Sequence, residues 1–297
     1  MLLSKELTLI GIENKCINEK EFNSLGLAGY NDGKDVCTFI ADAKYASELS
    51  QGISMVITTE EVSKELNGDY GICIVDNPRI AFFKLHQALS TKEGYAREQY
   101  DTIIAPSAKI SPLAHIADKN VTIGENVIIE EFVSIKENTI IKDNCIIHSG
   151  TVVSSTGFEH IKNGSEIIDI NHIGGVIVEN NVEINANNTI DRAIYPWDNT
   201  IIGEKCRTGN LVQIAHGVKV GSETLVTSHS SISGRVIIGN NVWIGPGCII
   251  RNAVSIGNNA RVNMGSVVTL SVEEGQAVSG NFAIPHSIFM NNLKGMK

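Results

Sequence analysis

Aliphatic side chains recur at every sixth position through most of the second half of the chain. From Ile202, steps of six reach Thr208, Ile214, Val220, Val226, Ile232, Ile238, Ile244, Ile250, Ile256, Val262 and Val268. Two earlier series with the same step run over 123–153 and 178–190. This period fits neither an amphipathic helix, which repeats every ~3.6 residues, nor a strand, which alternates every two.

The six-residue period predicts a triangular prism of short strands. Small or branched residues four places after each aliphatic, such as Val212 and Val218, supply a second inward position. Three strands close one coil, and successive coils stack in parallel at ~4.8 Å, so this β protein has room for about eight coils. Glycine often follows the aliphatic residue, as at Gly221 and Gly239, and we interpret these glycines as corners that need unusual backbone angles.

The extent of the period divides the chain into three parts. Residues 1–100 lack it and predict a small α/β domain, whereas 101–273 form the prism and 274–297 a short tail without a long helix. Two stretches interrupt the prism, near 154–177 and 191–201. Insertions in a solenoid leave the prism and commonly build a binding site, so we expect substrate specificity there.

Within the first part, local patterns predict individual elements. Helical periodicity covers 42–50 and 79–89, and a buried strand covers 54–58. Thr58 and Glu61 have the spacing of a capping box for the helix that follows.

Composition and charge narrow the class of protein. The chain has 33 acidic and 24 basic residues and a net charge of −9, which argues against nucleic-acid binding. Apolar runs fall short of the ~18 residues of an integral membrane segment, so we expect a cytoplasmic protein. The six cysteines are scattered without a Cys-x-x-Cys pair, which predicts reduced thiols rather than a disulfide framework or a zinc cluster.

Five ordered motifs resemble one family. They are TFIADAKY (38–45), IVDNPRIAFFKL (74–85), HSGTVV (148–153), VEI with TIDR (182–192) and NLVQIAH (210–216). The chain resembles the UDP-3-O-acylglucosamine N-acyltransferases of lipid A synthesis, which are hexapeptide-repeat enzymes. The resemblance implies a left-handed parallel β-helix, a homotrimer and a UDP-linked amino sugar as acceptor. It also implies acyl carrier protein or coenzyme A as the carrier of the acyl thioester.

The resemblance implies that His216 is the general base. An amine must lose a proton to attack a thioester carbonyl, and histidine titrates in the required range. Asn210 and Gln213 of the same motif are expected to bind substrate. Gly234, one 18-residue step beyond His216, is interpreted as the donor whose backbone amide stabilises the developing oxyanion.

Asp191 is a candidate partner of this histidine. If 191–201 is one loop grafted onto one hexad, Ile190 lies directly below Ile214 and Asp191 lies one coil under His216. A carboxylate there would orient the imidazole. If Pro196 instead opens a hexad of its own, the two residues lie on different faces of the prism.

Further substrate-binding residues are assigned outside this motif. Phe39 and Tyr45 resemble the family's uracil clamp, with Asp42 where the family usually has Asn; the alternative is that these aromatics fill the core. His148 is expected to contact donor or sugar, or to be an ordinary corner residue. Phe158 in the first insertion is expected to cover the substrate or to pin its loop.

Several departures from the family leave the donor open. Gly209 replaces an Asp, Ala253 replaces a second histidine, and the helical tail that engages acyl carrier protein is missing. Residues 241–252 look more like coenzyme-A-dependent acetyltransferases, so the alternative function is acetyl transfer to another nucleotide sugar for surface glycan synthesis.

Other classes of protein explain the sequence less well. A β-helical metalloenzyme needs three histidines converging on zinc, which the spacing around His216 does not offer. A solenoid that only binds leaves the QIAH motif unexplained. We expect no metal or redox cofactor. The carrier thioester is a substrate and not a cofactor.

Overall fold

The computed structural model describes residues 1–29, 35–280 and 285–294, so part of the expected tail lies outside the described residues. The chain divides into two compact units. Unit 1 contains residues 1–100, 156–174 and 193–198, and unit 2 contains residues 101–155, 175–192 and 199–297. The central segments of both inserted loops are therefore counted with the N-terminal residues.

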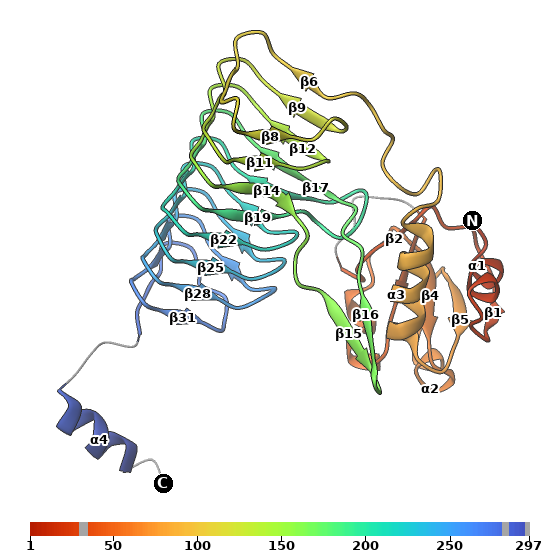
Figure 1. Cartoon of the computed structure of the whole chain (residues 1–297). Helices are drawn as coiled ribbons and strands as arrows, with labels where there is room; N and C mark the ends of the chain where they lie inside the picture. Colours follow the sequence, from red (N-terminus) through yellow and green to blue (C-terminus); the bar gives the residue numbers. More distant parts are fainter. Residues whose placement is uncertain (30–34, 281–284, 295–297) are drawn as a thin grey trace. The chain divides into compact units, whose positions relative to one another are not determined.

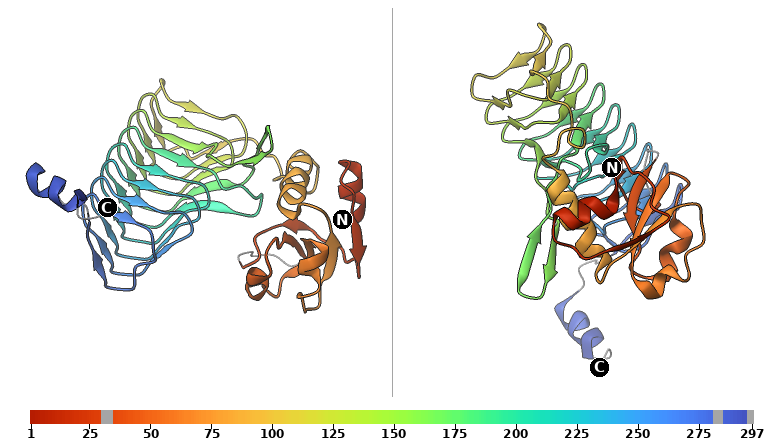
Figure 2. Two further views of the ribbon diagram at one scale, coloured as in Figure 1. Left: turned by 90° about the horizontal axis from the view of Figure 1, so that it is seen from below. Right: turned by 90° about the vertical axis from the view of Figure 1, so that its right-hand side faces the viewer.

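Unit 2 is a parallel β-helix with three sheets, and Figures 1 and 2 show its coils stacked in order. The first sheet contains β6 (Ile103–Ile104), β9 (Val121–Ile123), β12 (Thr139–Ile141), β17 (Gly175–Val178), β20 (Asn199–Ile202), β23 (Lys219–Val220), β26 (Ile237–Ile238) and β29 (Ser255–Ile256). The second contains β7 (Lys109–Ile110), β10 (Ile128–Ile129), β13 (Ile146–Ile147), β18 (Glu183–Ile184), β21 (Arg207–Thr208), β24 (Leu225–Val226), β27 (Trp243–Ile244), β30 (Arg261–Val262) and β32 (Ala277–Val278). The third contains β8 (His115–Ile116), β11 (Ser134–Ile135), β14 (Val152–Ser155), β19 (Thr189–Asp191), β22 (Gln213–Ile214), β25 (Ser231–Ile232), β28 (Ile249–Ile250) and β31 (Val267–Val268).

The hexad residues form the core of this β-helix, as predicted. Ile214 pairs in parallel with Ile190 of the preceding coil and Ile232 of the next, and all three are buried. The pairing of Ile190 with Ile214 excludes a separate hexad at Pro196. Because each aliphatic residue stacks on its equivalents, stability is built up between neighbouring coils.

The glycines that follow the aliphatic residues serve a different purpose from the one expected. The left-handed corners fall two residues later, at positions such as Glu223 (φ 60°) and Asn241 (φ 54°). A Cβ added to Gly221 would lie 2.5 Å from the carbonyl carbon of Gly239 in the next coil. These glycines are therefore required because adjacent coils approach closely, and not because their own backbone is left-handed.

Unit 1 is a small α/β fold around a mixed five-stranded sheet of order β1-β5-β4-β3-β2. Its elements are α1 (Leu3–Leu9), β1 (Lys15–Ile17), β2 (Ser24–Leu25), β3 (Val36–Phe39), the 3-10 helix η1 (Ala43–Glu48), β4 (Ile53–Thr58), α2 (Glu60–Ser63), β5 (Gly71–Ile74), α3 (Pro78–Leu89) and the hairpin of β15 (His160–Asn163) and β16 (Glu166–Asp169). Two local predictions need correction. The segment after Asp42 is a 3-10 helix, and Thr59, not Thr58, accepts the capping hydrogen bond from the N–H of Val62.

The inserted segments contribute to the hydrophobic core of unit 1. Ile161 and Ile168 of the hairpin, together with Tyr195 of the second insertion, are buried in one cluster with Phe22 and Phe82. The indole Nε1 of Trp197 donates to the carbonyl of Leu25 at 2.8 Å. The fold of unit 1 therefore depends on residues that the chain supplies from within the β-helix sequence.

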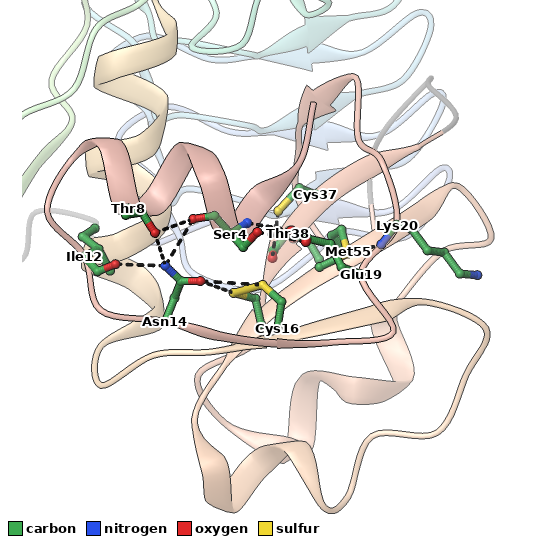
Figure 3. The surroundings of a disulfide bond; sticks show 11 residues. Ser4, Thr8, Ile12, Asn14, Cys16, Glu19, Lys20, Cys37, Thr38 and Met55 are labelled. Atoms are coloured by element: carbon green, nitrogen blue, oxygen red, sulfur yellow. Dashed lines mark hydrogen bonds between the residues drawn. A yellow bond between two sulfur atoms is a disulfide. The ribbon is translucent and has the colours of Figure 1, made fainter.

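Two of the six cysteines form a disulfide, so the prediction of reduced thiols is wrong for this pair. Cys16 of β1 and Cys73 of β5 are direct partners in an antiparallel pair, with their α-carbons 4.1 Å apart (Figure 3). The side chain of Asn14 lies beside both sulfur atoms. The two cysteines are 57 positions apart, so only the strand register brings them together. The other four cysteines are free and buried.

The tail contains a short helix that the sequence pattern did not reveal. This helix, α4, spans His286–Lys294, and residues 281–284 and 295–297 of the tail lie outside the described residues. None of the helices in the described parts of the chain is long and apolar enough to cross a membrane.

Candidate functional site

His216 lies two residues after the end of β22, at an edge of the prism. Its side chain is only 7% exposed. A Cβ added to Gly234 would lie 2.6 Å from both Nε2 and Cε1 of the imidazole. The ring therefore packs on the α-carbon of Gly234, as the 18-residue step predicts, and any side chain at position 234 would push it away.

The backbone around His216 is joined to the next coil. The carbonyl of His216 accepts a hydrogen bond from the N–H of Arg235 at 3.0 Å. Within the described residues the amide N–H of Gly234 makes no hydrogen bond. An amide donor thus lies beside the imidazole ring without a protein acceptor.

Thr200 of β20 connects the backbone of Asp191 to the backbone of Gly217, the residue after His216. Its hydroxyl donates to the carbonyl of Asp191 at 2.6 Å and accepts from the N–H of Gly217 at 2.9 Å. Thr200 is completely buried. Sequence reasoning missed this residue. The sequence carried one signal for its role, because Thr200 places a hydroxyl where the paired residue of the preceding coil is the buried Val176.

The carboxylate of Asp191 is held by two neutral donors. Its Oδ1 accepts from the hydroxyl of Ser155 at 2.6 Å, and its Oδ2 accepts from Nε2 of Gln213 at 3.2 Å. The side chain of Ser155 reaches Asp191 because the strand register shifts at Ser154, whose φ is 67°. Burial raises the pKa of Asp191, although both hydrogen bonds oppose that rise.

The strand register places Asp191 one residue away from the position expected from the sequence, which was directly under His216. Asp191 directly follows Ile190, and Ala215 directly follows the paired residue Ile214. The same register sets Asp191 opposite Ala215, the residue before His216. The role of Asp191 as an orienting group stays a prediction.

Gln213 and Asn210 have distinct surroundings. Gln213 bridges two coils, because its Oε1 accepts from the hydroxyl of Ser231 at 3.0 Å while its amide donates to Asp191. Asn210 accepts from the N–H of Ala186 at 3.2 Å. Gln213 therefore belongs to the polar network at this edge, and Asn210 joins neighbouring turns.

Gly209 lies where adjacent coils approach closely. A Cβ added to Gly209 would collide with the backbone and hydroxyl of Ser228 in the next coil. The position that corresponds to the family's second histidine is Ala253, a left-handed corner with a φ of 58°.

His148 lies at a different edge of the prism, after β13 of the second sheet. Its Nδ1 contacts Glu130 at 2.9 Å and its Nε2 contacts Glu183 at 3.0 Å. Burial disfavours the charged ring, but the hydrogen bonds to Glu183 and Glu130 outweigh it and raise the pKa of His148. The structure therefore does not bring His148 together with His216 within one chain.

The remaining predicted residues belong to unit 1. The ring of Phe39 is half-buried and packs on Phe82, with centroids 5.0 Å apart. Asp42 accepts hydrogen bonds from the side chain and the backbone of Lys44, which lower the pKa of Asp42. Tyr45 and Phe158 are 45% and 85% exposed, so both rings are accessible.

The side chains of the candidate site at the third sheet can support acid–base chemistry. Within residues 1–29, 35–280 and 285–294, no three His, Cys, Asp or Glu side chains gather so that they could hold a metal ion. The site at the third sheet offers a buried imidazole, an adjacent amide donor and a buried carboxylate.

The stacked hexads and this edge site define a hexapeptide-repeat transferase. A family model described as bacterial transferase hexapeptide (six repeats) matches residues 120–155 and 235–269. A solved UDP-N-acetylglucosamine acyltransferase of Francisella novicida has the same β-helical fold. It is 20% identical and covers 64% of this chain and 71% of that chain, with a TM-score of 0.50.

Curated relatives narrow the class to one family. UDP-3-O-acylglucosamine N-acyltransferase of Campylobacter lari is 37% identical over 268 residues, which cover 82% of this chain and 81% of that protein. A protein of the same name from Methylobacillus flagellatus is 35% identical over 225 residues, 68% of this chain and 63% of that protein. The chain belongs to the UDP-3-O-acylglucosamine N-acyltransferase family and is an N-acyltransferase.

Proposed function

We propose that this N-acyltransferase moves an acyl group from a thioester of acyl carrier protein or coenzyme A to the amine of a UDP-linked amino sugar, in lipid A-type synthesis. The observation that carries the proposal is the imidazole of His216, buried and packed on Gly234. The names of the relatives supply the acceptor, UDP-3-O-acylglucosamine.

His216 acts as the general base in this mechanism. The imidazole takes a proton from the sugar amine while the nitrogen attacks the thioester carbonyl carbon. The N–H of Gly234 donates to the carbonyl oxygen as its negative charge develops. When the intermediate collapses, the carbon–sulfur bond breaks, and the imidazolium gives its proton to the leaving thiolate. The products are the amide and the free thiol.

Asp191 acts as a positioning residue for this base. Its carboxylate, fixed by Ser155 and Gln213, stabilises the imidazolium that forms when His216 takes the proton. A buried charge needs this kind of fixed hydrogen bonding, because otherwise it would be neutralised.

Unit 1 binds the uridine part of the acceptor. Tyr45 offers an exposed ring, and Phe39 offers a half-buried one. Asp42 between them can only accept hydrogen bonds from the base while it is ionised. His148 and Phe158 contribute contacts to the donor or to the sugar.

The functional form is a cytoplasmic homotrimer. The support is a row of isoleucines on the outer face of the first sheet, where Ile140, Ile177 and Ile201 are paired strand to strand. Lys219 follows Ile201 in this row and separates it from Ile237, which is 48% exposed. An apolar row of this kind is typical of an interface between subunits. Light scattering after size exclusion checks the trimer, and an Ile177→Glu variant that remained a trimer would contradict this interface.

A transfer assay tests the function. Each acceptor, UDP-3-O-acylglucosamine or UDP-glucosamine, is incubated with each donor, 3-hydroxyacyl carrier protein or acetyl-CoA. The products are identified by mass spectrometry. We expect a hydroxyacyl amide from wild type and none from His216→Ala. His115→Ala is the matched control, because His115 lies exposed on the same sheet several coils away.

The products also separate the two donors. An acetylated sugar would favour the alternative, acetyl-CoA-dependent transfer for surface glycan synthesis. Full activity in a folded His216→Ala protein would overturn the assignment of the base, and an inactive wild type with every pair would overturn the proposed function.

A further inference from the structure

Arg235 lies in the coil after His216 and is joined to it through the backbone. Its N–H donates to the carbonyl of His216 at 3.0 Å, and it directly follows Gly234, on which the imidazole packs. Adjacent coils are ~4.8 Å apart, so the backbone of Arg235 lies one coil from the base.

Within the described residues, no hydrogen bond or ion pair holds the guanidinium of Arg235. Its Nη2 is shielded from solvent without any hydrogen bond, and among the described residues Arg235 takes part in no ion pair. A guanidinium nitrogen that is shielded from water without a partner costs free energy, which a bound anion would recover.

The other arginines of the prism are all satisfied by the protein. Arg192 donates to the carbonyl of Ser154, Arg207 pairs with Glu183, Arg251 donates to the carbonyl of Thr269, and Arg261 donates to Asn263 and lies over Trp243. Among the described residues, Arg235 therefore lacks the kind of contact that these arginines make. It lies one coil from the proposed base.

We propose that Arg235 is a substrate-binding residue whose guanidinium receives a phosphate group of a substrate held at His216. The inference rests on the proposed function, in which both substrates carry phosphate. The acceptor has the diphosphate of its nucleotide, and the donor has the phosphodiester of its pantetheine arm. Arginine suits either one, because its planar guanidinium can donate two parallel hydrogen bonds to phosphate oxygens.

Steady-state kinetics of Arg235→Gln and Arg235→Lys test the proposal. We expect the KM for one substrate to rise about tenfold to a hundredfold in Arg235→Gln, as the loss of a charged hydrogen bond predicts. The turnover number should stay near that of wild type, and Arg235→Lys should lose less. Arg261→Gln, which removes an arginine at another edge of the prism, is the matched control.

The affected substrate identifies the phosphate. A raised KM for the nucleotide sugar assigns Arg235 to the diphosphate, and a raised KM for the acyl donor assigns it to the pantetheine arm. Unchanged values for both substrates would overturn the proposal.

A binding measurement separates this inference from the proposed function. Titration calorimetry with UDP and with coenzyme A gives dissociation constants that need no turnover. If wild type transfers no acyl group, the proposed function fails, and the calorimetry still decides the role of Arg235. Weaker binding of one probe to Arg235→Gln supports the proposal, whereas equal binding of both probes refutes it.

Discussion

The imidazole of His216 packs on the α-carbon of Gly234, one coil further along the prism. A methyl group at position 234 would come within 2.6 Å of the ring, so Gly234→Ala must displace it. We expect acyl transfer to fall roughly a hundredfold, because a catalytic group moved by about an ångström loses this much. Gly280→Ala is the control, since no atom lies near that position. Activity of Gly234→Ala close to wild type would mean that the ring does not act from this place.

Thr200→Val tests the connection between Asp191 and the backbone after His216. Valine has the same shape but leaves the carbonyl of Asp191 and the N–H of Gly217 without their shared hydroxyl. We expect a loss of stability of about 1–3 kcal/mol. We also expect a lower kcat with little change in KM, because the base is displaced and binding is not. Thr200→Ser keeps the hydroxyl and should restore kcat. Equal kinetics for the serine and valine variants would make Thr200 a packing residue only.

Asp191→Asn should change how stability depends on pH. Burial raises the pKa of Asp191, so the folded state favours its protonated form and pays a penalty once the carboxyl ionises. The variant removes this penalty. Its stability relative to wild type should therefore increase as the pH rises from below 3.8, the ordinary pKa of an aspartate, through the raised pKa. Thermal unfolding across this range checks the slope.

The same variant tests the orienting role. We expect Asp191→Asn to lose activity while it remains folded, because a neutral amide does not stabilise the imidazolium. A variant with wild-type turnover would remove Asp191 from the mechanism, whatever its effect on stability.

The prism could be predicted from the sequence because its period is carried by residues such as Ile214 and Ile232, which stack on each other directly. The register between Ile190 and Ile214 survives an insertion for the same reason. The position of Gly234 beside His216 follows from that 18-residue step. Each of these relationships depends on spacing alone, which a sequence displays.

Other relationships depend on contacts between distant segments. The register shift at Ser154 turns Ser155 toward Asp191, and the hexad pattern does not predict this shift. Tyr195 joins the core of unit 1 although it lies within the β-helix sequence, because an apolar loop residue does not reveal its partners. That Nη2 of Arg235 has no hydrogen-bond partner among the described residues becomes visible only in the folded structure.

His148 should make stability depend on pH in the opposite sense to Asp191. Burial lowers its pKa, but its hydrogen bonds to Glu183 and Glu130 outweigh burial and raise the pKa above 6.5, the ordinary value for histidine. The contribution to stability is therefore complete below that value and is lost as the pH rises through the raised pKa. The free energy of unfolding of wild type should exceed that of His148→Gln by a larger margin at pH ~5.5 than at pH ~9. A margin that does not change with pH, measured by urea unfolding, would show that the ring is not charged in this cluster.

Reduction should destabilise unit 1 by opening the bond between Cys16 and Cys73. The bond closes a loop of 57 positions, and the chain-entropy estimate for a loop of this size is ~4 kcal/mol. Denaturant unfolding with and without reductant measures the difference, followed at Trp197, whose indole is anchored to Leu25 in unit 1. The double variant Cys16→Ala, Cys73→Ala should have the stability of reduced wild type, and reductant should not change it. If both thiols instead react with an alkylating agent in the untreated folded protein, and reductant leaves unfolding unchanged, the bond makes no contribution to the stability of this protein.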